Sequence, residues 1–506
     1  MVLEKIQKEN DIKKLTPEEL ELLKDEIRQF LIESISVTGG HLASNLGVVE
    51  LTMALHLCFD LPKDKIVWDV GHQSYTHKIL TGRKDGFSSL RQYGGMSGFP
   101  KADESDCDCF NTGHSSTSIS AGLGLATARQ VTGDDYHVVS VIGDGALTGG
   151  MAYEALNNAS SVKGNFIIVL NDNNMSISEN VGGISQYLSG FRTADAYRDF
   201  KNNVMNSLNH IPIYGERMVK HIRNTKSSIK QLFIPGMFFE EMGIIYLGPV
   251  DGSDIKEMCR VFDEAKRVDG PVLVHVLTKK GAGYGPAERY PSRFHGAEPF
   301  VIETGLPKNK RTKANYTDVF STVMKKLGER NPKVVAITAA MADGTGLRRF
   351  HRNFPDRFFD VGIAEAHATT FAAGLAKAGL IPVFAVYSSF LQRAFDQILH
   401  DVCIQNLHVI FAIDRAGLVG SDGETHQGIF DISYLSVIPN MTIMAPKNKW
   451  ELSDMMKFAV AYDGPIALRY PRGTAYDDLK EIRQPIELAK SELIRKGSTV
   501  AIMALG

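Results

Sequence analysis

The chain is poor in cysteine, in net charge and in long apolar runs, and each shortage excludes a class of protein. Its five cysteines are scattered over 506 residues, which indicates no disulfide framework and favours a reducing, cytoplasmic location. The 58 acidic and 56 basic residues leave a net charge of -2, which gives no electrostatic support for binding nucleic acid. No run of about 18 apolar residues occurs and the first residues are polar, so neither a membrane span nor a signal peptide is predicted.

The composition is typical of a folded protein with several domains. Hydrophobic residues make up 43% of the chain and charged residues 23%, so there is apolar material for more than one core. At about 150 residues per domain, the length suggests roughly three domains. A first helix is predicted to begin after Thr16 as N-cap, with Pro17 in its first turn, and to run to about residue 36.

Short apolar runs rich in β-branched residues alternate with helical patterns along most of the chain. This alternation is typical of parallel sheets whose strands are joined by crossover helices. The sequence therefore predicts an α/β protein with two doubly wound, mostly parallel sheets. The predicted strands are 138–142, 166–170, 272–277, 334–338, 383–387, 409–413, 442–444 and 466–469.

Polar segments divide the chain into three predicted parts. A basic linker within 299–315 separates a first domain, 1–310, from a second, 311–480. Residues 481–506 are predicted to be a linker followed by a strand at 499–505, the first strand of a truncated third domain. Residues 185–230 are predicted to form a mobile insertion, helical near 204–229, although a solvated surface segment is the alternative.

One local motif points to chemistry. Gly143-Asp144-Gly145 follows the strand at 138–142, and Asn173 follows the next strand, 29 residues after Asp144. Because the carboxyl ends of parallel strands share one edge of a sheet, we expect Asp144 and Asn173 to meet there. Their oxygens suit Mg²⁺, and the glycines let backbone N–H groups approach a diphosphate. The alternative is an ordinary glycine-rich turn followed by a polar loop.

This spacing resembles the diphosphate–magnesium motif of thiamine-diphosphate enzymes, and further motifs extend the resemblance. From about residue 15 to the end, the chain resembles the 1-deoxy-D-xylulose-5-phosphate synthase family, which is transketolase-like. The main departure is length, because members of that family carry a full C-terminal domain. The motifs that carry the resemblance are 41–47, 68–78, 113–120, 361–367, 387–397, 423–428 and 469–473.

The resemblance implies a transferase that joins pyruvate to D-glyceraldehyde 3-phosphate with loss of carbon dioxide. The product, 1-deoxy-D-xylulose 5-phosphate, would begin the non-mevalonate isoprenoid pathway and also feed thiamine and pyridoxal synthesis. The resemblance further implies thiamine diphosphate and Mg²⁺ as cofactors and a homodimer as the assembly. Two alternatives stay open, namely another transketolase-type enzyme and a truncated, catalytically silent protein that binds the cofactor.

The resemblance also assigns roles to cofactor-binding residues. Glu365 would contact the aminopyrimidine ring and Phe390 would stack on it, although a helix-end carboxylate and a core aromatic are the ordinary interpretations. Magnesium would be held by Asp144, Asn173 and the backbone carbonyl of Met175. The remaining cofactor contacts would be His72, Ser115, Gly145, Ala146 and Lys280, with Lys279 as the alternative to Lys280.

Histidines and arginines complete the implied site. Histidines suit proton transfer near neutral pH, and the resemblance places four of them around the reacting carbons: His41, His114, His295 and His426. Arg415 and Arg472 follow predicted strands, where ligands collect, and guanidinium groups bind phosphate. A surface ion pair is the alternative for each arginine. The implied substrate contacts are Tyr387, Arg393, Arg415, Asp422 and Arg472.

Overall fold

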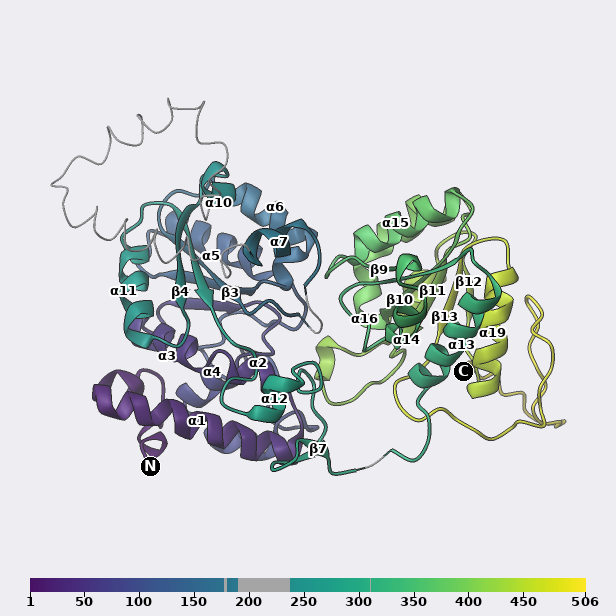
Figure 1. Ribbon diagram of the computed structural model, residues 1–506, viewed down its shortest axis with the longest axis horizontal. Coiled ribbons are helices and arrows are strands. Elements are labelled where there is room, and N and C mark those ends of the chain that lie inside the picture. The colour runs from purple at the N-terminus through teal and green to yellow at the C-terminus, as the bar shows by residue number, and fades with distance from the viewer. Residues whose placement is uncertain (177–179, 190–236, 310) are drawn as a thin grey trace.

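A computed structural model describes residues 1–176, 180–189, 237–309 and 311–506 of the chain. Two lobes, each built around one parallel sheet, lie side by side (Figure 1). The strands from β1 to β5 belong to the first lobe and the strands from β8 to β13 to the second. The predicted class, α/β with two doubly wound parallel sheets, is confirmed.

Within the described residues, the first sheet has five parallel strands in the order β1-β2-β3-β5-β4. Its central strands are buried on both faces, because alternate side chains pack against helices on opposite sides. Ile167 and Val169 of β3 join the core under α1, α3 and α11, whereas Ile168 and Leu170 join the core under α5 and α6. The strands are β1 Lys65–Trp68, β2 Val138–Gly143, β3 Phe166–Asp172, β4 Ile245–Asp251 and β5 Pro271–Leu277.

The helices of this lobe begin and end where local chemistry requires. Thr16 caps α1 through a capping box with Glu19, and Pro17 is its first residue, so the predicted start is confirmed. The helices are α1 Pro17–Thr38, α2 Leu42–Leu46, α3 Val49–Cys58, α4 Tyr75–Leu80, α5 Ser118–Thr132, α6 Gly150–Ala159, α7 Gly183–Ser189, α10 Met237–Glu241, α11 Ile255–Lys266 and α12 Gly285–Arg289. A short hairpin joins β6 Phe300–Val301 to β7 Leu306–Pro307.

The second sheet has six parallel strands in the order β12-β13-β11-β10-β8-β9. Helices α13, α14 and α19 cover one face and α15 covers the other. The strands are β8 Val334–Thr338, β9 Phe358–Asp360, β10 Ile381–Tyr387, β11 Ile410–Asp414, β12 Thr442–Met444 and β13 Ile466–Arg469. The helices are α13 Tyr316–Arg330, α14 Arg348–Asn353, α15 Glu365–Lys377, α16 Ser388–Leu391, α17 Phe395–Gln397, α18 Asp431–Leu435 and α19 Lys449–Ala461.

The structure corrects the predicted elements in two places. Residues 499–505 form no strand and are exposed, because no neighbouring strand accepts their backbone hydrogen bonds. The edge strands β4 and β9 were not predicted, since β4 is interrupted by Gly248-Pro249 and β9 has only three residues. The insertion predicted at 185–230 begins in α7 and otherwise lies outside the described residues.

The predicted division at residues 310 and 480 stays a prediction, and residue 310 itself is not described. The hydrophobic clusters around the first sheet lie before residue 310 and those around the second sheet lie after it. The two sets share no residue. In the described part of the chain, no helix has the length and apolar character needed to cross a membrane.

Helix α5 approaches the first sheet so closely that a glycine is required. A methyl group added at Gly122 would lie 2.1 Å from the Ser140 hydroxyl and 2.7 Å from the Phe166 ring. Gly122→Ala should therefore lower the free energy of unfolding by about 1–3 kcal/mol. Gly124→Ala is the matched control, because that position is open and alanine favours helix by about 1 kcal/mol. Equal chemical denaturation curves for the two variants would contradict this packing.

Candidate active site

A cavity lies where the carboxyl ends of the two sheets converge. It contains about 1030 Å³ of space not filled by protein atoms, part of it open to solvent. Side chains from both lobes line it, which is the position where parallel sheets bind ligands. The predicted site residues in its wall are His41, His72, Ser115, Asp144, Gly145, Ala146, Asn173, Met175, Lys280, His295, Glu365, Phe390, Arg393 and His426.

Five other predicted residues lie outside the set that lines this cavity. The His114 ring packs edge-on against Phe390 at 5.2 Å, and Tyr387 stacks on Phe390 at 5.6 Å. The guanidinium of Arg415 lies 3.8 Å from the Tyr387 ring centroid. Asp422 lies 3.7 Å from Nε2 of His41, and the exposed Arg472 donates to the Val419 carbonyl at 3.4 Å.

The predicted metal residues come together at the ends of β2 and β3. Asp144 is buried and its Oδ2 accepts a hydrogen bond from Asn180 at 2.8 Å. The Oδ1 of Asn173 accepts the backbone N–H of Met175 at 3.1 Å. A side chain at Gly145 would lie 2.7 Å from Cβ of Ser176, so the two turns pack without room for one. Within the described residues, no group of three or more His, Cys, Asp or Glu could hold a metal ion.

Glu365, the first residue of α15, is buried opposite this corner. Burial raises the pKa of its carboxyl, and the nearby charge of Arg393 opposes the rise only in part. The Arg393 guanidinium lies 3.9 Å from Glu365 and donates across the lobes to the hydroxyl of Ser115 at 3.1 Å. The site therefore holds a carboxyl group that keeps its proton more readily than an exposed glutamate.

Three histidine rings cluster in the wall of the first lobe. The ring centroids of His41 and His72 are 5.6 Å apart, and those of His72 and His295 are 5.1 Å apart. Burial lowers the pKa of His41 to about 3 and that of His426 to about 4, so both rings are neutral at pH 7. A neutral imidazole offers one nitrogen as a proton acceptor.

The two neighbouring lysines lie in different surroundings. Lys280 is buried in the cavity wall and donates to the carbonyl of Ser176, while burial lowers its pKa to about 8. Lys279 is exposed and pairs with Glu288 at 2.6 Å. Lys280 is therefore the lysine placed to meet a ligand in the cavity.

Hydrogen bonds between the lobes hold the cavity together. Arg91 donates to Asp422 at 2.6 Å, and their side chains are only 8% and 12% exposed. His114 Nε2 lies 2.6 Å from the carbonyl of Thr425, and the N–H of Ile363 donates to Thr148 at 3.0 Å. At Gly113 an added Cβ would lie 2.5 Å from Thr425, so this approach requires glycine.

Among the residues in or near the site that the sequence analysis missed, Asp69 and Arg91 make the strongest polar contacts. Asp69 lines the cavity and accepts the backbone N–H groups of Ser116 and Ser118 at 2.7 and 2.9 Å. As a carboxylate directly after β1, it could have been found by the argument used for Asp144. Arg91 lies in an irregular loop, and no sequence signal linked it to Asp422, 331 residues later.

The cavity suits thiamine diphosphate with a divalent cation. Nδ1 of His72 is buried and has no hydrogen-bond partner among the described residues, which points to a polar ligand beside it. Gly143 leaves open space where a side chain would stand, and Lys280 adds a cation. Asp144 and Asn173 offer the oxygen ligands that Mg²⁺ prefers.

Comparisons with known proteins show which family the sequence resembles. A family model described as 1-deoxy-D-xylulose-5-phosphate synthase matches residues 3–278, and one described as the transketolase pyrimidine binding domain matches 312–476. The 1-deoxy-D-xylulose-5-phosphate synthase of Lachnoclostridium phytofermentans is 58% identical over 505 residues, which cover 100% of this chain and 81% of that one. The same enzyme of Natranaerobius thermophilus is 57% identical over 507 residues, covering 100% and 80%. A solved transketolase of Campylobacter jejuni is 18% identical, covers 90% of this chain and 79% of its own, and has a TM-score of 0.41.

Fold, cavity and family models together define a thiamine-diphosphate-dependent transferase of the transketolase-like class. Within that class, the chain belongs to the 1-deoxy-D-xylulose-5-phosphate synthase family, because the first model covers more than half of it. The predicted family and enzyme class are therefore confirmed. The individual roles of the site residues stay predictions.

The buried ion pair between the lobes can be tested by removing one partner. Arg91→Ala should lower the free energy of unfolding by about 3 kcal/mol, because it leaves the Asp422 carboxylate nearly buried without its cation. Lys101→Ala is the matched control, since its ion pair with Glu424 also crosses the lobes but is 31% and 70% exposed. That control should change stability by less than about 1 kcal/mol. Similar urea midpoints for both variants would show that burial of the Arg91 pair is unimportant.

Proposed function

We propose that this chain catalyses the decarboxylative condensation of pyruvate with D-glyceraldehyde 3-phosphate, giving 1-deoxy-D-xylulose 5-phosphate and carbon dioxide. The observation that carries the proposal is the cavity, which joins Asp144 of one lobe to Glu365 of the other. The chain that forms this cavity belongs to the 1-deoxy-D-xylulose-5-phosphate synthase family. As part of the same proposal, this reaction would be the first step of isoprenoid precursor synthesis. Its product would also supply thiamine and pyridoxal synthesis.

Both halves of the cofactor have candidate partners. When bound, thiamine diphosphate supplies a carbanion centre that adds to a keto group and accepts the electrons released with carbon dioxide. Asp144, Asn173 and the carbonyl of Met175 would hold Mg²⁺. The diphosphate would lie against His72, Ser115 and Lys280 and the backbone of Gly145 and Ala146, while Phe390 would stack on the aminopyrimidine.

Glu365 is placed to control a proton at the aminopyrimidine. Because burial raises its pKa, the carboxyl would share a proton with a weakly basic ring nitrogen more readily than an exposed glutamate. His41 and His426 are neutral at that pH, so each can accept a proton or donate one N–H to a developing alkoxide. His114 and His295 lie in or beside the same wall and would complete the polar surround of the reacting carbons.

The aldehyde's phosphate would enter on the side of the second lobe. Arg415 lies over Tyr387, and Arg472 is exposed near the same strand ends, where fixed guanidinium groups could bind phosphate. Arg393 and Asp422 border this path, and Asp422 already holds Arg91. The four groups would orient the acceptor toward His41 and His426.

A cytoplasmic homodimer is the assembly that the family suggests for this function. Light scattering of the purified protein tests the assembly, with twice the chain mass of 55.7 kDa as the expected result. A monomer that retains turnover would remove the dimer from the proposal.

A turnover assay tests the proposed reaction directly. The chain is incubated with thiamine diphosphate, Mg²⁺, carboxyl-labelled pyruvate and D-glyceraldehyde 3-phosphate, and carbon dioxide and sugar phosphates are measured by mass. The proposal requires carbon dioxide and a five-carbon ketose phosphate in equal amounts. Turnover of ketose phosphates without carbon dioxide would favour a transketolase activity, and no turnover with bound cofactor would favour a silent protein.

Glu365→Gln tests the proton role apart from binding. The amide keeps the shape of the side chain but cannot exchange a proton, so hydrogen–deuterium exchange at C2 of the bound cofactor should slow about 100-fold or more. Cofactor affinity, measured by calorimetry, should change little. Glu329→Gln, an exposed position on α13, is the control. Exchange at the wild-type rate in Glu365→Gln would refute this role.

A further inference from the structure

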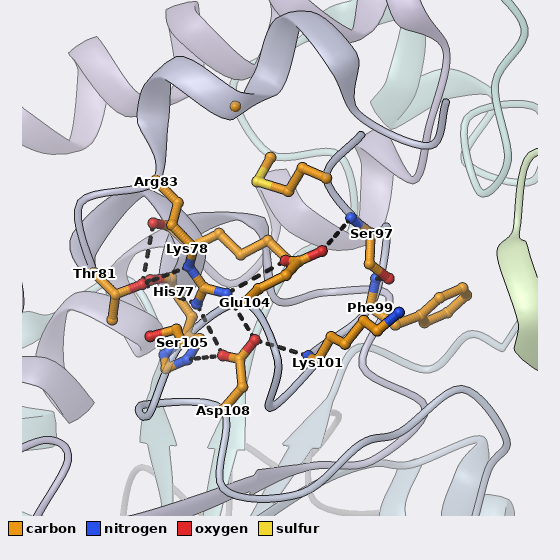
Figure 2. Close-up of polar contacts among 12 residues, drawn as sticks. His77, Lys78, Thr81, Arg83, Ser97, Phe99, Lys101, Glu104, Ser105 and Asp108 are labelled. Carbon is orange, nitrogen blue, oxygen red and sulfur yellow. Dashed lines mark hydrogen bonds and ion pairs between the residues drawn. The ribbon is translucent and has the colours of Figure 1, made fainter. Parts of the chain in front are cut away.

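A network of charged side chains joins helix α4 to the loop between α4 and α5 (Figure 2). Lys78 is fully buried and its ammonium contacts Glu104 at 2.5 Å. Arg83 binds Asp108 through two hydrogen bonds of 2.7 and 2.8 Å, and His77 lies 2.9 Å from the same carboxylate. Although burial alone would raise it, the pKa of Asp108 is lowered by the hydrogen bonds from Arg83 and His77.

The network reaches the cavity through a short chain of contacts. The free oxygen of the Glu104 carboxylate accepts the backbone N–H of Ser97 at 2.6 Å, and the Ser97 hydroxyl accepts the N–H of Phe99 at 3.1 Å. Figure 2 shows Ser97 between Glu104 and Phe99. The Phe99 ring stacks on the imidazole of His426, with centroids 5.1 Å apart and planes 11° apart.

This stacking matters because His426 comes from the other lobe. Phe99 is 3% exposed and also lies 5.5 Å from the ring of His41, so one buried aromatic ring packs against both histidines. The charged and titratable groups that face His426 are Asp422, His114, Arg415, Arg91, His41 and His72. Only Phe99 is stacked parallel to the ring among its aromatic contacts in the described residues.

We propose that Glu104 is a positioning residue for His426: paired with buried Lys78, it fixes Ser97 and thereby holds Phe99 flat against the His426 ring. The importance of this orientation for turnover rests on the proposed function. The orientation of the His426 ring does not depend on the proposed function, because it is a property of the protein without substrate. Burying the Lys78 ammonium against Glu104 has a desolvation cost. An apolar pair would avoid this cost but could not accept the N–H of Ser97 and so fix the loop.

The test compares three single changes by NMR of the full chain with ring-¹³C histidine, without added cofactor. Glu104→Gln removes the charge that pairs with Lys78, and Ser97→Ala removes the acceptor for Phe99 while leaving the ion pair. Asp103→Asn is the matched control, because it neutralises an exposed carboxylate in the same loop. The spectrum of His426→Gln identifies the signal of the His426 ring.

We expect Glu104→Gln and Ser97→Ala to move the His426 signal and to raise its pKa by about one unit, since a displaced Phe99 exposes the ring to water. Asp103→Asn should match the wild type. An unchanged His426 signal and pKa in folded Ser97→Ala overturns the proposal, even if Glu104→Gln fails to fold. A purely structural network would lower the thermal midpoint in Glu104→Gln and leave His426 unaltered.

Turnover then separates this inference from the proposed function. If His426 serves catalysis, the variants with a displaced ring should lose about tenfold in kcat/KM at pH 7. A displaced ring with wild-type turnover would support the positioning by Glu104 and contradict the catalytic role of His426. Loss of turnover with an unmoved His426 signal would overturn the positioning.

Discussion

The structure depends on one constraint: the carboxyl ends of two separate parallel sheets must face a common space. Each sheet packs against its own helices and has its own hydrophobic clusters, so neither lobe forms the cavity by itself. The approach is held by the buried pair of Arg91 and Asp422 and by the close fit of Gly113 against Thr425. Asp144 and Asn173 of the first lobe line the same cavity as Glu365 of the second.

Burial then sets the chemistry of the groups inside. It lowers the pKa of His41 and His426, so these rings stay neutral, and it raises the pKa of Glu365, so this carboxyl retains a proton more readily. Lys280 remains mostly charged near neutral pH, with a pKa of about 8. One buried space thus contains neutral imidazoles, a carboxyl group of raised pKa and a lysine.

Local patterns in the sequence predicted most of the strands, because an apolar run is visible in consecutive residues. They also predicted the polar residues that follow those strands, because a glycine turn is equally local. Asp144 and Asn173 are examples, since each follows its own strand. Contacts between distant segments left no such signal. Arg91, Phe99 and Glu104 lie in an irregular loop, and their importance comes from residues of the other lobe or from buried partners. The strand predicted at 499–505 does not form for a related reason, because an apolar run alone cannot supply the neighbouring strand that it would have to pair with.

The central claim is that two lobes share one cofactor site, and calorimetric titration with thiamine diphosphate tests it most directly. The titration is made with and without Mg²⁺ on the wild type, on Asp144→Ala from the first lobe and on Phe390→Ala from the second. Lys279→Ala, an exposed neighbour of Lys280, is the control. The account predicts magnesium-dependent binding that weakens about tenfold or more in both lobe variants and is unchanged in the control. Binding at wild-type strength in either lobe variant would contradict it.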